Sequence, residues 1–206
     1  TSGGTVPPSS FPADTFVPPV FTTTPKEPVE EERIEEIEDS EVPAAAASWL
    51  KTPENIEAAV AALPHLDVPK AAWYAPSVAY VYSNGLMKGV SDTAFSPDAT
   101  LNRGMMAQII YNLARQPDSS VNTLFSDLDG RYYAEAVAWG ASRGILKGYS
   151  DTEFGGERDL TREQMAVMLY RYAVVLNLVG NVNHTVLDSF SDRGTISSWA
   201  KEALSW

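Results

Sequence analysis

The 206-residue sequence has no cysteine, only two histidines, and 15 basic residues against 27 acidic ones. Without cysteine the chain can form neither a disulfide nor a thiolate metal site, so packing alone must hold its folded part together. The histidines, His65 and His184, fall in predicted connections, and no Ser, His and acid spacing marks a catalytic triad. We therefore predict a protein that is not an enzyme and that binds no cofactor or metal.

The chain also lacks a basic surface signature and a long apolar run. Its formal net charge is -12, and no stretch alternates Lys or Arg with aromatic residues, which argues against nucleic-acid binding. The longest apolar stretch of the C-terminal half, residues 173–179, is interrupted by Asn177 and is far shorter than the roughly 20 residues of a membrane helix. The chain starts at Thr1 without a basic, apolar leader, so we expect a mature product or a piece of a longer protein.

Proline and acidic residues gather at the N-terminus. Eight of the 14 prolines fall in residues 1–43, and residues 26–41 hold nine acids but only two bases. Such a segment has little to bury and repels itself. We predict a flexible spacer over residues 1–43.

The most informative feature that is present is an internal repeat. Residues 73–107 align without a gap on residues 132–166, and 16 of the 35 pairs are identical. The shared loop reads GLMKGVSDTAF from Gly85 and GILKGYSDTEF from Gly144. A third copy starts at Phe190 and extends to Trp206, which covers its first helix. The predicted divisions are the spacer, a leading helix within 44–65, repeat 1 (66–124), repeat 2 (125–189) and an incomplete repeat 3 (190–206).

Each complete copy is predicted to be helix, ordered loop, helix. The first helices span about residues 75–84 and 134–143, and Gly85 and Gly144 stand where a helix end favours positive φ. The loops are expected to turn at their next glycines.

Capping residues mark where the other helices begin. Asn102 is expected to cap the second helix of repeat 1, and Thr161 with Gln164 forms a capping-box pattern in repeat 2. Thr52 followed by Pro53 predicts the start of the leading helix. This helix is expected to cover the open end of the repeat bundle, with docking of a partner as the alternative.

These residues resemble the S-layer homology family over about residues 66–206. The family pattern is an FxD start, an aromatic, Ala-rich first helix, a GxxxGxxDxxF loop and a Thr-Arg-Ala-Glu helix start. Repeat 2 follows it with Phe125, Asp127, Trp139, Gly144, Gly148, Asp151, Phe154, Thr161, Arg162 and Glu163. Repeat 1 keeps Gly85, Gly89, Asp92, Phe95 and Pro97 but reads Asn102, Arg103, Gly104 at the helix start.

The resemblance implies an all-α fold in which tandem repeats form a pseudo-threefold bundle with grooves between neighbours. It implies non-covalent anchoring at the bacterial cell surface by binding pyruvylated secondary cell wall polysaccharide. The motif arginines are implied to contact the acidic sugar, the loop Gly and Asp residues resemble those that shape the groove, and two aromatics occupy the family's first-helix position. The implied binding residues are Arg103, Arg162, Gly89, Asp92, Gly148, Asp151, Trp139 and Tyr80.

The residues themselves support an anion site at the two arginines. Each follows a cap residue, where a helix offers free N–H groups and a partial positive charge, so that a carboxylate would meet both backbone donors and a guanidinium. The alternative is a structural lock, in which the arginine pairs with Asp92, Asp151 or Glu157 and ties loop to helix. Lys88 and Lys147 recur in the loop, either to hold an anionic polymer or as plain surface residues, and the repeated aromatics suit a core or a sugar platform.

Two other functions remain open from the sequence. The chain could belong to a surface-layer assembly protein in which another chain, or a second copy, completes the third repeat. It could equally be the anchor of a larger surface enzyme whose catalytic domain lies elsewhere.

Overall fold

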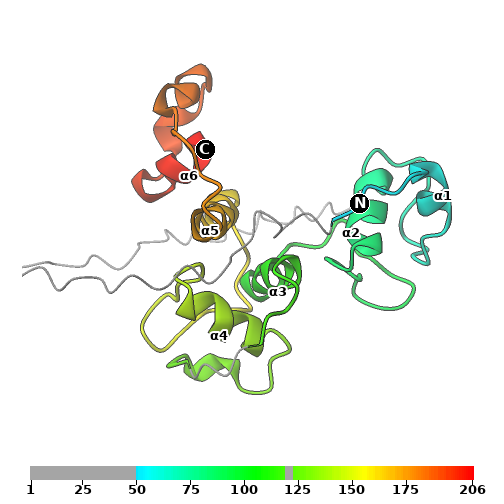
Figure 1. Cartoon of the computed structure of the whole chain (residues 1–206), viewed down its shortest axis with the longest axis horizontal. Helices are drawn as coiled ribbons and strands as arrows, with labels where there is room; N and C mark the ends of the chain where they lie inside the picture. Colours follow the sequence, from blue (N-terminus) through cyan, green and yellow to red (C-terminus); the bar gives the residue numbers. More distant parts are fainter. Residues whose placement is uncertain (1–49, 119–122) are drawn as a thin grey trace, which may run out of the picture. The chain divides into compact units, whose positions relative to one another are not determined.

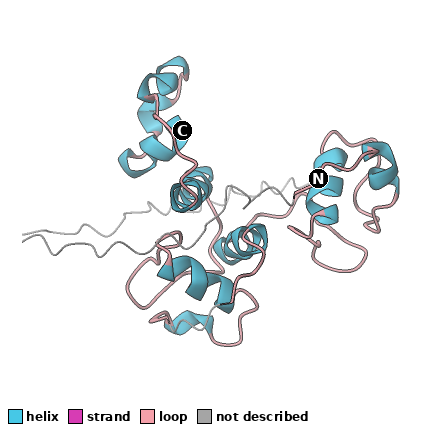
Figure 2. Ribbon diagram, viewed as in Figure 1, coloured by secondary structure: helices cyan, strands magenta, loops and turns pink. Residues whose placement is uncertain are grey.

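The computed structural model describes residues 50–118 and 123–206, and these two stretches form helices and loops (Figures 1 and 2). No strand occurs within them, which confirms the all-α prediction. The predicted spacer and the start of the leading segment lie outside the described residues. The α-helices are α1 (Ile56–Ala61), α2 (Ala75–Ser83), α3 (Arg103–Leu113), α4 (Ala134–Ser142), α5 (Arg162–Val175) and α6 (Lys201–Ser205), with four short 3-10 turns, η1 (Ser126–Leu128), η2 (His184–Ser189), η3 (Arg193–Thr195) and η4 (Ser198–Ala200).

The helices pack in consecutive pairs: α1 against α2, α3 against α4, and α5 against α6. The first helix of each repeat thus rests on the helix that precedes it in the chain. The pair α1 and α2 encloses an apolar cluster around Val60, Val68 and Ala75. A larger cluster around Ile110, Tyr133 and Phe154 joins α3, α4 and the loop of repeat 2. The leading helix α1 therefore packs on the first helix of repeat 1, α2, as α3 packs on the first helix of repeat 2, α4.

The predicted ends of the first helices are confirmed. Helices α2 and α4 stop within one residue of the expected positions, and Gly85 and Gly144 follow them with φ of 67° and 68°. This left-handed conformation favours glycine because an L side chain would be strained there.

The predicted caps are confirmed in both complete repeats but not in the leading helix. Asn102 accepts a hydrogen bond from the Met105 N–H, and Thr161 forms a full capping box with Gln164. The prediction that Thr52 caps the leading helix is wrong. Helix α1 starts at Ile56 because Asn55 adopts an extended conformation and accepts from the N–H of Ala58 at 2.9 Å.

An aspartate ahead of each first helix holds the loop of its own repeat. In repeat 2 the Asp127 carboxylate accepts hydrogen bonds from the N–H groups of Phe154 and Gly155, at 2.9 and 2.8 Å. In repeat 1, Asp67 binds the matching N–H groups at 2.8 and 2.7 Å. Burial raises the pKa of Asp127, but the two backbone hydrogen bonds outweigh it and leave the pKa below its ordinary value.

The two hydrogen bonds that Asp127 accepts predict how the stability of the fold responds to acid. A carboxyl with a depressed folded-state pKa stabilises the fold above its unfolded pKa of about 3.9, and this stabilisation is lost as the pH falls through the lower folded value. We expect Asp127→Asn to lower the free energy of unfolding at pH 7 by about 1–3 kcal/mol and to flatten the loss of stability below pH 4. Urea unfolding from pH 7 to pH 2 measures both. If Asp127→Asn loses as much stability between pH 4 and pH 2 as the unaltered protein, the Asp127 carboxylate does not stabilise the fold in this way.

The third copy has the predicted first helix in a short form. Helix α6 begins at Lys201, packs on α5, and is held there by a hydrogen bond of 2.8 Å from the Tyr170 hydroxyl to Glu202. Ahead of it, the N–H of Ser197 donates to the Glu163 carboxylate at 2.8 Å. Across the described stretches, no helix has both the length and the apolar character to cross a membrane.

Candidate functional site

The two motif arginines lie in opposite environments. Arg103, the first residue of α3, is 6% exposed and reaches into the loop of repeat 2. Its Nη2 donates to the carbonyl oxygen of Lys147 at 2.6 Å and its Nε to that of Phe154 at 3.2 Å. The guanidinium also lies over the rings of Tyr149 and Phe154, 4.8 and 4.7 Å from their centroids. Arg103 therefore fixes α3 of repeat 1 to the loop of repeat 2.

The backbone at the start of α3 makes the same connection. The N–H of Arg103 donates to the carbonyl of Arg158 at 3.0 Å, and the N–H of Gly104 to that of Gly156 at 2.8 Å. With the N–H of Met105 bound to the cap, the expected free N–H groups are absent here, and that part of the prediction is wrong for α3. Burial lowers the pKa of Arg103, yet the guanidinium remains charged because its ordinary value lies so high.

The structure supports a lock at Arg103, but not through the acids that the sequence suggested. Within residues 50–118 and 123–206, neither Asp92 nor Asp151 forms an ion pair, and both are exposed. Glu157 instead pairs with Arg131 at 3.3 Å and accepts from the Tyr133 hydroxyl at 2.7 Å. Carbonyl oxygens, which every loop carries whatever its sequence, hold Arg103 in place.

Arg162 begins α5 as Arg103 begins α3, but it is exposed. Its side chain has no hydrogen bond or ion pair to any described residue, and the N–H groups of Arg162 and Glu163 also donate to none. The free helix start that the sequence predicted for both arginines thus exists at α5.

The loop glycines are required by close approach of the backbone. At Gly89, φ is 90°, and an added Cβ would lie 2.6 Å from the Ala94 carbonyl oxygen and 2.8 Å from Nε2 of His65. At Gly148 it would lie 2.5 Å from the Phe125 ring and 2.6 Å from the Ser150 carbonyl oxygen. Both glycines therefore permit the tight turn that the sequence predicted and bring the loop against the residue at the FxD start.

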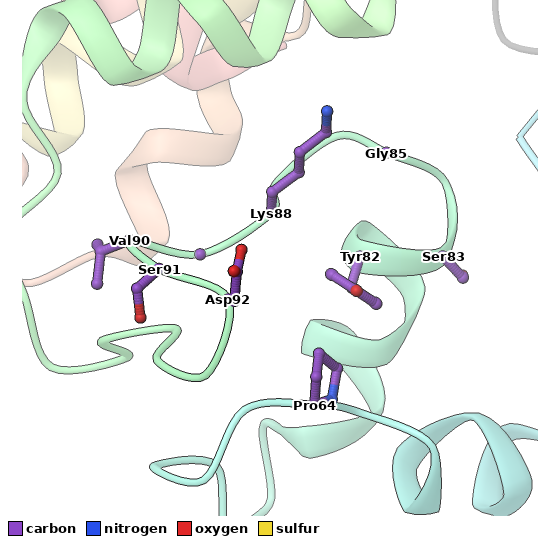
Figure 3. A pocket seen from close by; sticks show the side chains of 9 residues that line it. Pro64, Tyr82, Ser83, Gly85, Lys88, Val90, Ser91 and Asp92 are labelled. Carbon is purple, nitrogen blue, oxygen red and sulfur yellow. The ribbon is translucent and has the colours of Figure 1, made fainter.

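A pocket of about 740 Å³ lies beside the loop of repeat 1 (Figure 3). Tyr82 of α2 and Asp92 of the loop stand on facing sides of it, and Lys88 rises from the loop between them. The lining residues are Pro64, Tyr82, Ser83, Gly85, Lys88, Gly89, Val90, Ser91 and Asp92. Two of the predicted binding residues, Gly89 and Asp92, therefore share this pocket.

His65 is a residue whose place the sequence did not reveal. Its ring is 2% exposed, packs edge-on against Tyr82 and Phe95, and its Nε2 lies 2.9 Å from the carbonyl oxygen of Lys88. It stands where repeat 2 has Phe125, with Asp67 matching Asp127 two residues later. The matching aspartates were a sequence signal that His65 takes the place of Phe125. The change from Phe to His concealed this match.

The aromatic residues predicted as sugar contacts lie in or near the core. Trp139 is 7% exposed and packs between Tyr111 and Tyr172, with ring centroids 5.6 and 6.4 Å away. Tyr80 is half-buried on α2. Among the described residues no cluster of three or more His, Asp or Glu side chains is arranged to hold a metal ion.

Comparison with known proteins identifies the repeats. The S-layer homology domain family matches residues 66–107 and 124–166, one match in each complete copy. The chain therefore carries two S-layer homology domains, and the resemblance inferred from the residues is confirmed. This domain is a wall-anchoring module rather than a catalytic one, and it places the protein at the bacterial cell surface.

The relatives include a surface-layer protein, an anchoring protein and an enzyme. The chain is 31% identical to the surface-layer 125 kDa protein of Lysinibacillus sphaericus, over 67% of this chain and 11% of that protein. It is 29% identical to an endoglucanase of Bacillus sp. strain KSM-635, over 79% of this chain and 16% of the enzyme. It is 25% identical to the cellulosome-anchoring protein of Acetivibrio thermocellus, over 61% and 29% respectively. The chain thus spans less than a third of each of these relatives.

Proposed function

We propose that this chain anchors a bacterial surface protein by binding pyruvylated secondary cell wall polysaccharide non-covalently, with Arg162 as the main contact to the acidic sugar. The observation that carries the proposal is the contrast between the two motif arginines. Arg103 is buried and donates hydrogen bonds to two carbonyl oxygens, whereas Arg162 is exposed and its side chain contacts no described residue by a hydrogen bond or ion pair. A guanidinium with free donors offers a carboxylate a bidentate, charge-assisted contact.

The start of α5 adds backbone donors to the same site. Two N–H groups, those of Arg162 and Glu163, point out of the first turn of a 14-residue helix, whose partial positive charge favours an anion. The Glu163 carboxylate is engaged by the N–H of Ser197 at 2.8 Å, which offsets part of its repulsion of an approaching carboxylate.

The pocket of repeat 1 supplies a second candidate contact. Asp92 and Ser91 offer polar groups for sugar hydroxyls, Tyr82 offers a ring, and Lys88 offers a cation near the rim. In repeat 2 the matching Gly148 and Asp151 lie in the loop that receives Arg103. We propose that these loop residues contact the same polysaccharide along its length.

Two wider roles remain proposals about the protein as a whole. Similarity to a surface-layer protein favours an assembly role, in which another chain or a second copy packs against repeat 3. Similarity to an endoglucanase favours an anchor joined to a catalytic domain. Both rely on the same wall-binding module.

The proposal predicts a large effect at Arg162. Arg162→Ala should weaken binding to the purified polysaccharide about tenfold to hundredfold, because one charged hydrogen-bond donor is worth roughly 1.5–3 kcal/mol. Arg162→Lys should restore only part of the affinity, since a point charge cannot grip a carboxylate bidentately. Isothermal titration calorimetry at two salt concentrations measures both effects, and added salt should weaken binding further.

Replacing the exposed Arg193 with alanine is the matched control, since this change removes the same charge from another surface site. Arg193→Ala should leave the affinity within about twofold. Unchanged affinity in a folded Arg162→Ala protein would contradict the role of this residue.

A further inference from the structure

Two large aromatic side chains are exposed at the same position of the two complete repeats. Trp73 is 89% exposed and Tyr132 is 65% exposed, and they are 59 residues apart in the ungapped alignment. Each lies just before the first helix of its repeat. The fold does not bury them, although burying a side chain of this size is worth roughly 1.5–3 kcal/mol. Their exposure therefore calls for an explanation other than core packing.

Each exposed ring packs against the ring of the aromatic residue that follows it in the chain. Trp73 meets Tyr74 edge-on with centroids 5.7 Å apart, and Tyr132 meets Tyr133 in the same way at 5.1 Å. Tyr133 is itself fixed, being 1% exposed and bound through its hydroxyl to Glu157. The support restricts the rotation of the exposed ring and leaves a face open to solvent.

An ion pair lies near the exposed ring in repeat 2, since Arg131 precedes Tyr132 in the chain and Glu157 binds the hydroxyl of Tyr133, on which Tyr132 packs. Arg131 and Glu157 form an ion pair of 3.3 Å in which both side chains are about half exposed. Burial, followed by the negative charge of Glu157, raises the pKa of Tyr132, in keeping with a carboxylate close to the ring. A flat apolar face beside an oriented guanidinium and carboxylate matches a pyranose, which has an apolar C–H face and a polar rim.

We propose that Trp73 and Tyr132 are stacking platforms for sugar rings of the wall polysaccharide, and that Arg131 and Glu157 bind the rim of the sugar on Tyr132. This inference rests on the proposed function and extends it to residues outside the arginine motif and the glycine loops. The spacing of one platform per repeat suits a polymer of repeating units. An exposed protein partner would be the competing occupant.

The first test is affinity. Trp73→Ala and Tyr132→Ala should each weaken polysaccharide binding about threefold to tenfold, as expected for loss of one aromatic contact of about 0.5–1.5 kcal/mol. Tyr132→Phe should bind normally because the ring face is kept. Leu124→Ala is the matched control, since Leu124 is an 80% exposed apolar side chain that has no ring.

The second test reports on the residues directly. Hydroxyl-radical footprinting of the unaltered chain, with and without polysaccharide, should show protection of Trp73 and Tyr132 and none of Leu124. If the chain binds the polysaccharide but both rings remain unprotected and both alanine variants bind normally, the platforms are refuted while the anchoring function stands. If the unaltered chain does not bind the polysaccharide at all, the proposed function and the platforms fail together.

Discussion

Replacing Arg103 with alanine is expected to lower the free energy of unfolding by about 2–4 kcal/mol. The variant leaves two carbonyl oxygens without the guanidinium donor, that of Phe154 in a buried hydrogen bond and that of Lys147 in a partly buried one. It also removes a planar cation that lies over the Tyr149 and Phe154 rings. Because the contacts join α3 of repeat 1 to the loop of repeat 2, the two repeats should also lose cooperativity.

Chemical unfolding monitored by tryptophan fluorescence measures this effect, and Arg162→Ala is its matched control. Both variants remove an arginine from the first position of a helix, but Arg162 is exposed and its loss should change stability by less than about 0.5 kcal/mol. Equal losses in the two variants would show that a helix start, and not the buried contacts, sets the stability. A broadened transition in Arg103→Ala alone would support coupling between the repeats.

Gly104→Ala is expected to cost about 1–3 kcal/mol, although alanine favours helices. A Cβ on Gly104 would lie within 2.8 Å of Cζ of Tyr133, whose ring is 1% exposed and cannot move aside. The hydrogen bond of 2.8 Å from the Gly104 N–H to Gly156 fixes the backbone against the same ring. Calorimetry of the single variant gives the loss as a fall in melting temperature.

A double-mutant cycle distinguishes this clash from other causes. In repeat 3 the residue that matches Tyr133 is Ala200, and the helix start facing it carries the larger Glu163 in place of glycine. With Tyr133→Ala as background, Gly104→Ala should therefore become neutral or stabilising by up to about 1 kcal/mol. The same cost in both backgrounds would contradict steric conflict with Tyr133.

The repeat alignment was sufficient to predict the helices and loops of both complete copies. Gly85, Gly144, Asn102 and Thr161 act through local backbone geometry, so their positions in sequence decide their roles. The leading helix was misplaced at its start because Thr52 and Asn55 are both good caps, and tertiary packing of Val60 on α2 decides between them.

The environment of the arginines could not be predicted in the same way. Arg103 and Arg162 occupy identical positions in their repeats, and the difference between them depends on which loop lies against each helix start. That contact is between residues more than 40 apart, such as Arg103 and Lys147. The departure from the family pattern at Gly104 was visible in the sequence, but its cause, the Tyr133 ring, lies in the next repeat.

The aromatic positions show a similar limit. Trp139 and Trp73 both occur in aromatic, Ala-rich segments, yet one is 7% exposed and the other 89%. Helical spacing places Trp139 on the face of α4 that meets α3, whereas Trp73 precedes its helix and no element covers it among the described residues. Burial, which decides between a core residue and a candidate sugar contact, had to come from the structure.

Recognition of the acidic sugar by Arg162 is tested most directly by a thermodynamic cycle that combines Arg162→Ala with removal of pyruvate from the polysaccharide. Calorimetry would give four affinities, for the unaltered chain and the variant with each form of the polymer. If Arg162 binds the pyruvate carboxylate, removing pyruvate should weaken the unaltered chain about tenfold to hundredfold and the variant by less than about threefold. Equal losses for both proteins, or no loss for the unaltered chain, would contradict recognition of the acidic sugar by Arg162.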